Sequence, residues 1–164
     1  MRRLTLLILS LLALAAAPAQ AQSLERSKHL WATVNICDTK QSPDTLGLRA
    51  SMPGSGRRGE RMFMRFKAQY FSEVDNRWHN FLADGLRSGW VTLGSARVRA
   101  RQSGWSFPFR LEPGQRWELR GVVEFQWRRK GKVVRRFARR TRSGHRTAVA
   151  EPKGYSAATC ELTA

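Results

Sequence analysis

Apolar and polar residues alternate with a period of two along most of the chain, whereas helical periodicity is scarce. The clearest stretch begins at Met62, and one of its two faces is formed by Met62, Met64, Phe66, Ala68 and Tyr70. Because successive side chains of a strand point to opposite faces, this alternation predicts half-buried β-strands.

Turn-forming residues divide this pattern into short segments. Ser42-Pro43-Asp44, the glycine-rich stretch 53–59, Asp75-Asn76 and Glu112-Pro113-Gly114 are typical of turns and loops. The strands expected between these turns cover residues 29–37, 45–52, 62–71, 78–81, 90–93, 105–111, 116–129, 133–141 and 157–162. Short strands with turns at this spacing predict an all-β sandwich or barrel.

Lys130-Gly131 is expected to be a two-residue turn that joins the longest predicted strand to the next one. A regular register across this turn would place Trp127 opposite Val134, Phe125 opposite Arg136 and Glu124 opposite Phe137. Glu124 would then have Arg135 and Arg139 as diagonal neighbours.

The tryptophans are expected to serve mainly as core residues. Those at positions 31, 90, 105, 117 and 127 lie on predicted strands and have apolar neighbours two positions away. Trp78 and Trp90 stand beside a polar hairpin and a glycine-bearing loop, so we expect these two to be the most exposed.

Residues 1–21 have the three parts of a secretory signal peptide. Arg2 and Arg3 precede an uncharged run over 4–17, and Ala19-Gln20-Ala21 supplies the small residues of a cleavage site. The run is shorter than the roughly 20 residues that a transmembrane helix needs, which favours export over anchoring. Cleavage would remove two arginines and lower the net charge of +18 to +16. We expect a secreted protein, extracellular or in the cell envelope, with no transmembrane anchor.

The chain contains two cysteines, Cys37 and Cys160, near the two ends of the predicted mature chain. In an oxidising compartment an even pair of cysteines is most simply one disulfide. This disulfide would place the first strand beside the C-terminal tail. The alternative of two free thiols lacks a neighbouring histidine that could activate either sulfur.

The stretch 111–122 reads Leu-Glu-Pro-Gly-Gln-Arg-Trp-Glu-Leu-Arg-Gly-Val and resembles the corner before the sixth strand of fibronectin type III domains. That family has Leu-x-Pro-Gly-x-x-Tyr followed by alternating aliphatic residues, and residues 62–78 resemble its third strand and the hairpin after it. The resemblance implies an immunoglobulin/fibronectin III-like sandwich of about seven to eight strands with one disulfide, and such domains rarely catalyse reactions. Trp117 replaces the tyrosine of the pattern, and the cysteine pair lies outside it.

These features divide the chain into three parts. Residues 1–21 are the signal peptide and 22–141 the fibronectin III-like β-sandwich. Residues 142–164 form a C-terminal tail, whose last short strand is bridged back through Cys160.

No motif typical of a nucleophilic, phosphate-cradling or metal-binding site occurs in the chain. The three histidines, His29, His79 and His145, are far apart, and the aspartates stand beside turn-forming residues, where they commonly bond backbone N–H groups: Asp38, Asp44, Asp75 and Asp84. We therefore expect no catalytic centre, no metal and no cofactor. A hydrolase that brings His79 or His145 beside a carboxylate and a hydroxyl is the less favoured alternative.

Basic residues are the strongest departure from an ordinary composition, with 30 lysines and arginines against 12 acidic residues. Between Arg128 and Arg146 there are ten basic residues in nineteen positions and no acidic one. Arg97, Arg99 and Arg101 would share one side of an extended chain. The residues predicted to bind polyanions are Arg97, Arg99, Arg101, Arg128, Arg129, Lys130, Lys132, Arg135, Arg136, Arg139, Arg140 and Arg142.

A planar guanidinium can bond two oxygens of a carboxylate, sulfate or phosphate at once. The expected partners are therefore an anionic polysaccharide, a wall phosphopolymer or a membrane surface, with nucleic acid less favoured. Two alternatives stay open. The arginines could reflect genome composition and protection of an edge strand against aggregation, or the protein could bind other proteins through loops such as 53–59.

Overall fold

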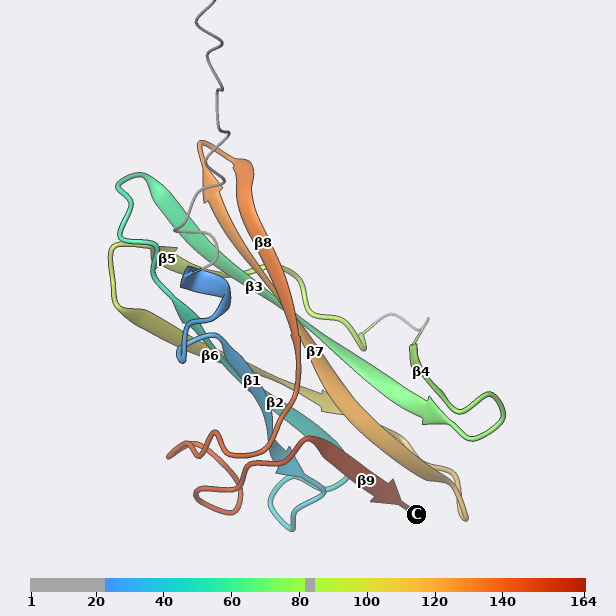
Figure 1. Cartoon of the computed structure of the whole chain (residues 1–164). Coiled ribbons are helices and arrows are strands. Elements are labelled where there is room, and N and C mark those ends of the chain that lie inside the picture. The colour runs from blue at the N-terminus through green and yellow to red at the C-terminus, as the bar shows by residue number, and fades with distance from the viewer. Residues whose placement is uncertain (1–22, 82–84) are drawn as a thin grey trace, which may run out of the picture.

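The structure is a computed structural model that describes residues 23–81 and 85–164 and contains two antiparallel β-sheets (Figure 1). The first sheet has the order β1-β2-β6, formed by β1 (Trp31–Cys37), β2 (Thr45–Pro53) and β6 (Ala100–Pro108). The second sheet contains β3 (Glu60–Ser72), β4 (Arg77–Asn80), β5 (Val91–Ser95), β7 (Arg116–Arg129), β8 (Lys132–Arg140) and β9 (Thr159–Thr163). The predicted signal peptide, 1–21, and Asp84 lie outside the described residues.

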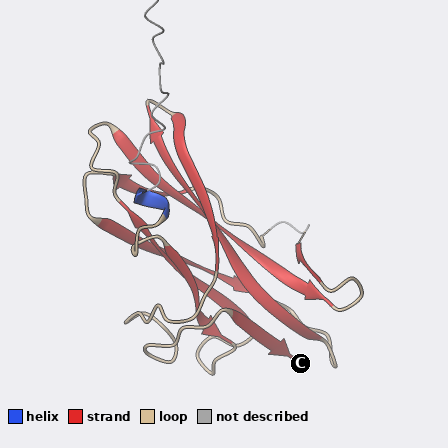
Figure 2. Cartoon of the chain, in the orientation of Figure 1, coloured by secondary structure: helices blue, strands red, loops and turns tan. Residues whose placement is uncertain are grey.

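In the second sheet β3 and β7 are the central strands. β4 and β5 pair with opposite ends of β3, and β8 and β9 pair with opposite ends of β7. Strands dominate the described residues, with a single helical turn at 23–25 (Figure 2). The all-β sandwich predicted from the alternation is confirmed. The described part of the chain has nine strands, one overlapping each predicted segment, whereas the fibronectin III resemblance implied about seven to eight.

The core lies between the two sheets and follows the predicted alternation. Met62, Met64 and Phe66 of β3 are fully buried. The same is true of Phe125 and Trp127 of β7, and the Trp127 Nε1–H donates to the carbonyl oxygen of Pro53 at 3.2 Å. Trp127 is thus the one tryptophan that is buried as expected, whereas Trp105 is exposed and the others are half-buried.

The predicted disulfide between Cys37 and Cys160 is present, with a Cα–Cα distance of 5.4 Å. It joins the end of β1 to β9, which pairs with the start of β7. The bridge therefore connects the two sheets. Closing a loop of this length stabilises the fold by about 4–5 kcal/mol in the chain-entropy treatment. It also fits a protein that resides in an oxidising compartment outside the cytoplasm.

The predicted register of the β7–β8 hairpin is wrong by one residue. Lys130 and Gly131 do form a two-residue turn with positive φ values of 48° and 77°, but Trp127 lies opposite Arg135 rather than Val134. A β-bulge leaves Val134 as an additional residue, so Phe125 opposes Phe137 and Glu124 opposes Ala138. The shift turns the Phe137 ring toward Trp127, with centroids 5.6 Å apart, and turns Arg136 toward solvent.

The arginines at 97, 99 and 101 do not share one extended segment. β6 begins at Ala100 and ends at Pro108, earlier than the predicted strand over 105–111, and Arg97 and Arg99 lie in the turn before it. The reason is tertiary pairing, because β6 matches β2 along its whole length, from Pro108 opposite Thr45 to Ala100 opposite Pro53.

The chain leaves the second sheet at Thr141 and reaches the edge of the first. The Thr141 amide donates to the carbonyl of Gly121 in β7, and the next amide, that of Arg142, donates to the carbonyl of Ala32 in β1. The buried side chain of Leu24 anchors the N-terminal segment, 23–30, to the core. No helix in the described ranges is long and apolar enough to cross a membrane.

Candidate anion-binding surface

One end of the sandwich, which we call the hairpin end, carries the β7–β8 turn, the 53–59 loop and the 96–99 turn (Figure 1, top and upper left). Backbone hydrogen bonds join these segments: the Gly54 amide donates to the carbonyl of Arg99, and the Ala96 amide donates to the carbonyl of Glu60. Glu60 in turn lies opposite Arg129. Segments that are far apart in the sequence therefore meet at one surface.

The hairpin end gathers most of the predicted polyanion-binding residues and several that were not predicted. Its basic residues are Arg57, Arg58, Arg61, Arg97, Arg99, Arg101, Arg128, Arg129, Lys130 and Lys132. All are exposed except Arg57 and Arg128, which are half-buried. The turn and loop geometry thus brings Arg97, Arg99 and Arg101 to the same end as Lys130, although not on one straight strand.

The Glu60 carboxylate is buried beneath this surface, with 1% of its side chain exposed. One oxygen accepts hydrogen bonds from the Ser55 hydroxyl at 2.7 Å and from Arg135 at 2.9 Å, and the other lies 3.7 Å from Arg129 and 4.0 Å from Arg57. The Arg135 side chain is only 9% exposed. Arg135 is therefore an internal partner of Glu60 and is not part of the exposed basic surface.

The opposite end of the sandwich carries most of the carboxylates. These are Asp38, Asp44, Glu73, Asp75, Glu112, Glu118, Glu151 and Glu161. They are mixed with exposed cations, and Arg116 pairs with Glu161 at 2.7 Å. The Glu161 carboxylate also raises the pKa of the Arg116 guanidinium. Positive charge is thus concentrated at the hairpin end.

On the outer face of the second sheet, guanidinium groups stack on aromatic rings. The Arg128 guanidinium lies 4.2 Å from the ring centroid of Phe63 and 4.8 Å from that of Trp90. The Arg65 guanidinium also lies over the Trp90 ring, 4.5 Å from its centroid. Such contacts hold the planar groups in defined orientations.

Glu124 on the same face binds Arg65 at 2.6 Å and Lys67 at 2.7 Å. Partial burial alone would raise the pKa of the Glu124 carboxyl, but the hydrogen bonds from Arg65 and Lys67 lower this pKa below its ordinary value. Glu124 thus pairs with β3 cations and not with Arg135 or Arg139, the neighbours expected from the regular register.

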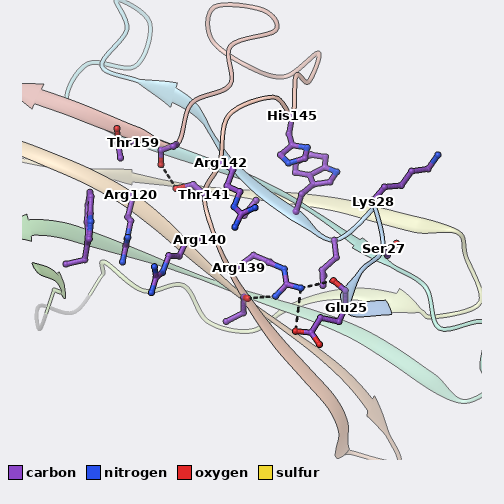
Figure 3. Close-up of a pocket in the computed structure, with 16 residues that line it drawn as sticks. Glu25, Ser27, Lys28, Arg120, Arg139, Arg140, Thr141, Arg142, His145 and Thr159 are labelled. Carbon is purple, nitrogen blue, oxygen red and sulfur yellow. Dashed lines mark hydrogen bonds and ion pairs between the residues drawn. The ribbon is translucent and has the colours of Figure 1, made fainter. Parts of the chain in front are cut away.

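A second basic region, which we call the arginine cleft, opens where the chain crosses from β7 to β1 after the end of β8. It is a cleft of about 900 Å³ between the N-terminal segment, β7 and the end of β8. Its charged and aromatic lining residues are Glu25, Lys28, Trp31, Trp78, Arg120, Arg139, Arg140, Arg142 and His145 (Figure 3).

The cations of the arginine cleft greatly outnumber its carboxylates. Glu25 interacts with Arg139, which donates to the Glu25 carbonyl oxygen at 2.7 Å and lies 3.8 Å from its carboxylate. Arg120 is held by a hydrogen bond to Gln69 at 2.8 Å and by stacking on Trp78 at 4.2 Å. Among the described residues, no carboxylate lies within ion-pair distance of Arg120, Arg140 or Arg142.

Like charges in the cleft act on one another. Burial and then the neighbouring charge of Arg140 lower the pKa of Arg120, and burial and then Arg142 lower the pKa of His145. Figure 3 shows the same arrangement, with Arg120 beside Arg140 and with Arg142 nearer to His145. An anion placed between these groups would relieve their repulsion.

The histidines are separated in the fold as well as in the sequence. His79 Nε2 lies 2.8 Å from an Asp75 carboxylate oxygen, and this contact lowers the pKa of Asp75. His145 stacks on Trp31 with ring centroids 4.8 Å apart, and His29 Nε2 accepts a hydrogen bond from Arg99. Within residues 23–81 and 85–164, no group of three or more His, Cys, Asp or Glu side chains could hold a metal ion.

No protein-family model matches this chain, and no curated protein matches it significantly in sequence. The fibronectin III resemblance of residues 111–122 therefore stays a prediction. The charges and geometry of the site itself therefore indicate what the protein does.

Sequence reasoning identified Arg139, Arg140 and Arg142 but missed Lys28, Arg120 and His145, with which they form the arginine cleft. The alternation along β7 already places Arg120 on the face opposite to the core. The position of Arg140 beside Arg120 could not be predicted, because the regular register would have placed Arg139 rather than Arg140 opposite Val122. Only the bulge brings Arg120 and Arg140 together.

Proposed function

We propose that this protein is an exported, non-catalytic module that binds anionic polymers outside the cell, through the hairpin end and the arginine cleft. The polymer would carry carboxylate, sulfate or phosphate groups, as in acidic polysaccharides, wall phosphopolymers or membrane surfaces. The predicted signal peptide and the disulfide support a location in the cell envelope or the extracellular space.

The observation that carries this proposal is the segregation of charge between the two ends of the sandwich. If the arginines reflected composition alone, they would be spread over the whole surface and mixed with exposed carboxylates. The basic residues of the hairpin end instead surround one buried carboxylate, Glu60. An unbalanced basic surface raises the local concentration of anionic polymers and speeds their association.

The test is binding to heparin-like and polyphosphate resins by two variants with equal charge loss. In the hairpin-end variant Arg97, Arg101, Arg129 and Lys132 become Gln, and in the control variant the exposed cations of the opposite end, Lys40, Arg77, Arg110 and Lys153, become Gln. All of these side chains are exposed, so both variants should fold.

We expect the hairpin-end variant to elute at clearly lower salt than the control variant. On a DNA-like lattice each lost contact reduces the slope of log K against log salt by about 0.7–0.9. Equal elution of the two variants would refute a localised site. Capture of one defined protein at high salt, without competition by polyanions, would instead support the protein-binding alternative through loop 53–59.

A further inference from the structure

We propose that the arginine cleft is a site for an acidic saccharide, a sugar unit that carries a carboxylate or sulfate group within a longer glycan. This inference rests on the proposed function and specifies the chemistry of one of its two regions. The hairpin end would attract the polymer through long-range electrostatics, and the cleft would recognise an individual unit of it.

The arginine cleft has the size of a small-molecule site. Its volume of about 900 Å³ lies at the upper end of the range of about 300–1,000 Å³ for small-molecule sites. A lone inorganic anion would leave most of this space to water. The cleft is therefore suited to a ligand with the size of a short oligosaccharide.

The charge of the cleft favours an acidic ligand. Arg120, Arg140 and Arg142 come from three different positions along β7, β8 and the segment after β8, and none has a carboxylate partner among the described residues. Arg120 is already oriented by Gln69 and Trp78, so little conformational freedom would be lost when it binds a ligand. A guanidinium and a carboxylate or sulfate can form two parallel hydrogen bonds.

The remaining lining of the cleft combines hydroxyl and apolar groups. Ser27 and Thr159 provide hydroxyl groups, and Leu30, Ala138 and Ala158 provide apolar surface. A sugar ring has both hydroxyl groups and C–H surface, whereas polyphosphate has neither.

The aromatic rings of the cleft favour a saccharide over nucleic acid. Proteins that bind single-stranded nucleic acid stack bases on open aromatic faces. Here His145 covers one face of Trp31 with an interplanar angle of 4°, and Arg120 covers one face of Trp78. Those faces cannot stack on a base, and the cleft instead presents guanidinium and hydroxyl groups to a ligand.

The experiment is isothermal titration of the exported protein with a hexuronate oligosaccharide, at two salt concentrations. Arg140→Gln removes a cation of the cleft. Arg136→Gln is its matched control, because Arg136 is also exposed, lies four residues away on β8 and does not line the cleft. Arg142→Gln gives an independent second test of the cleft.

We expect Arg140→Gln and Arg142→Gln to weaken hexuronate binding by about tenfold or more, since each substitution removes a charge-assisted hydrogen bond to the ligand. Arg136→Gln should change it less than about threefold, as expected for an exposed charge. Polyphosphate and an oligodeoxynucleotide of equal charge should bind with no greater sensitivity to Arg140→Gln than to Arg136→Gln.

Equal effects of Arg140→Gln and Arg136→Gln on hexuronate binding would overturn the inference. The same holds if polyphosphate or the oligonucleotide depends on Arg140 as strongly as the hexuronate does. If hexuronate binding instead depends only on the hairpin-end residues, the proposed function stands and the cleft site fails. If none of these polyanions binds the unaltered protein at low salt, both fail.

Discussion

Turns and loops connect the strands at both ends of this sandwich, but the two ends differ in how they balance charge. At the opposite end, carboxylates and cations are exposed together, as in the Arg116–Glu161 pair. At the hairpin end the carboxylate is buried and the cations are exposed, and the charge of Glu60 is balanced by the buried Arg135, so the exposed cations stay available to a ligand. The comparison shows that the placement of a few carboxylates, more than the number of arginines, makes one end a candidate binding surface.

The largest effect on stability should come from the opposite end, where the disulfide joins β1 to β9. Cys37→Ser with Cys160→Ser should lower the free energy of unfolding by about 4–5 kcal/mol, because the unfolded chain regains the freedom that the bridge removes. Denaturant unfolding measures this loss. The folded fraction of this variant should still bind polyanions. A loss of binding by the folded variant would show that the hairpin end depends on the disulfide at the opposite end.

At the hairpin end, removal of the Glu60 carboxylate should be nearly as costly. Glu60→Ala should destabilise the protein by about 3–5 kcal/mol, because it leaves the buried Arg135 guanidinium without its partner. Urea or thermal unfolding tests this expectation.

The double variant Glu60→Leu with Arg135→Met is the control for this pair. It should recover much of the loss, since replacement of both buried charges by apolar groups is often neutral or stabilising. If Glu60→Ala were harmless, the carboxylate would not be the support that this surface requires.

Between the two ends, Glu124 should make stability depend on pH. Its pKa is below the ordinary value in the folded protein, so the folded state binds fewer protons than the unfolded state in acid. Its contribution should be complete above about pH 4.5 and should be lost as the pH falls through the lowered pKa.

Glu124→Gln should flatten this part of the profile of unfolding free energy against pH, measured by urea unfolding from pH 6 to pH 3. Asp38→Asn, which alters an exposed carboxylate in a loop, is the comparison variant. An unchanged profile for Glu124→Gln would show that the contacts with Arg65 and Lys67 do not favour the charged form.

The limits of sequence-based reasoning differ between these regions. Period-two alternation was sufficient to predict β3 and β7, because their alternate residues are buried as the pattern requires. It could not predict the bulge at Val134, since the bulge is favoured by the packing of Phe137 against Trp127, two rings from different strands. That single inserted residue decides which β8 arginines face solvent, and the internal role of Arg135 follows from it.

The candidate site depends even more on tertiary contacts. The basic run from Arg128 to Arg146 is evident in the sequence, but its division between the hairpin end, the internal Arg135 and the arginine cleft is not. Arg120 comes from β7, His145 from the segment after β8 and Lys28 from the N-terminal segment, so the cleft forms only when these three segments pack together. Such convergence requires the register and the strand crossover at Thr141, neither of which a local pattern specifies.

The smallest expected effect concerns Glu112, a carboxylate in the loop before β7 at the end opposite the hairpin end. Glu112→Gln should change polyanion affinity by less than about twofold at 150 mM salt. β7 has 14 residues, which separates the two ends by about 45 Å at the rise of an extended strand. This is several times the Debye length of about 8 Å at that ionic strength, so charges at one end are screened from a ligand at the other. A marked gain in affinity in a salt-dependent titration would mean that the bound polymer runs along the whole of β7, and the contrast between the ends would then describe two parts of one binding surface.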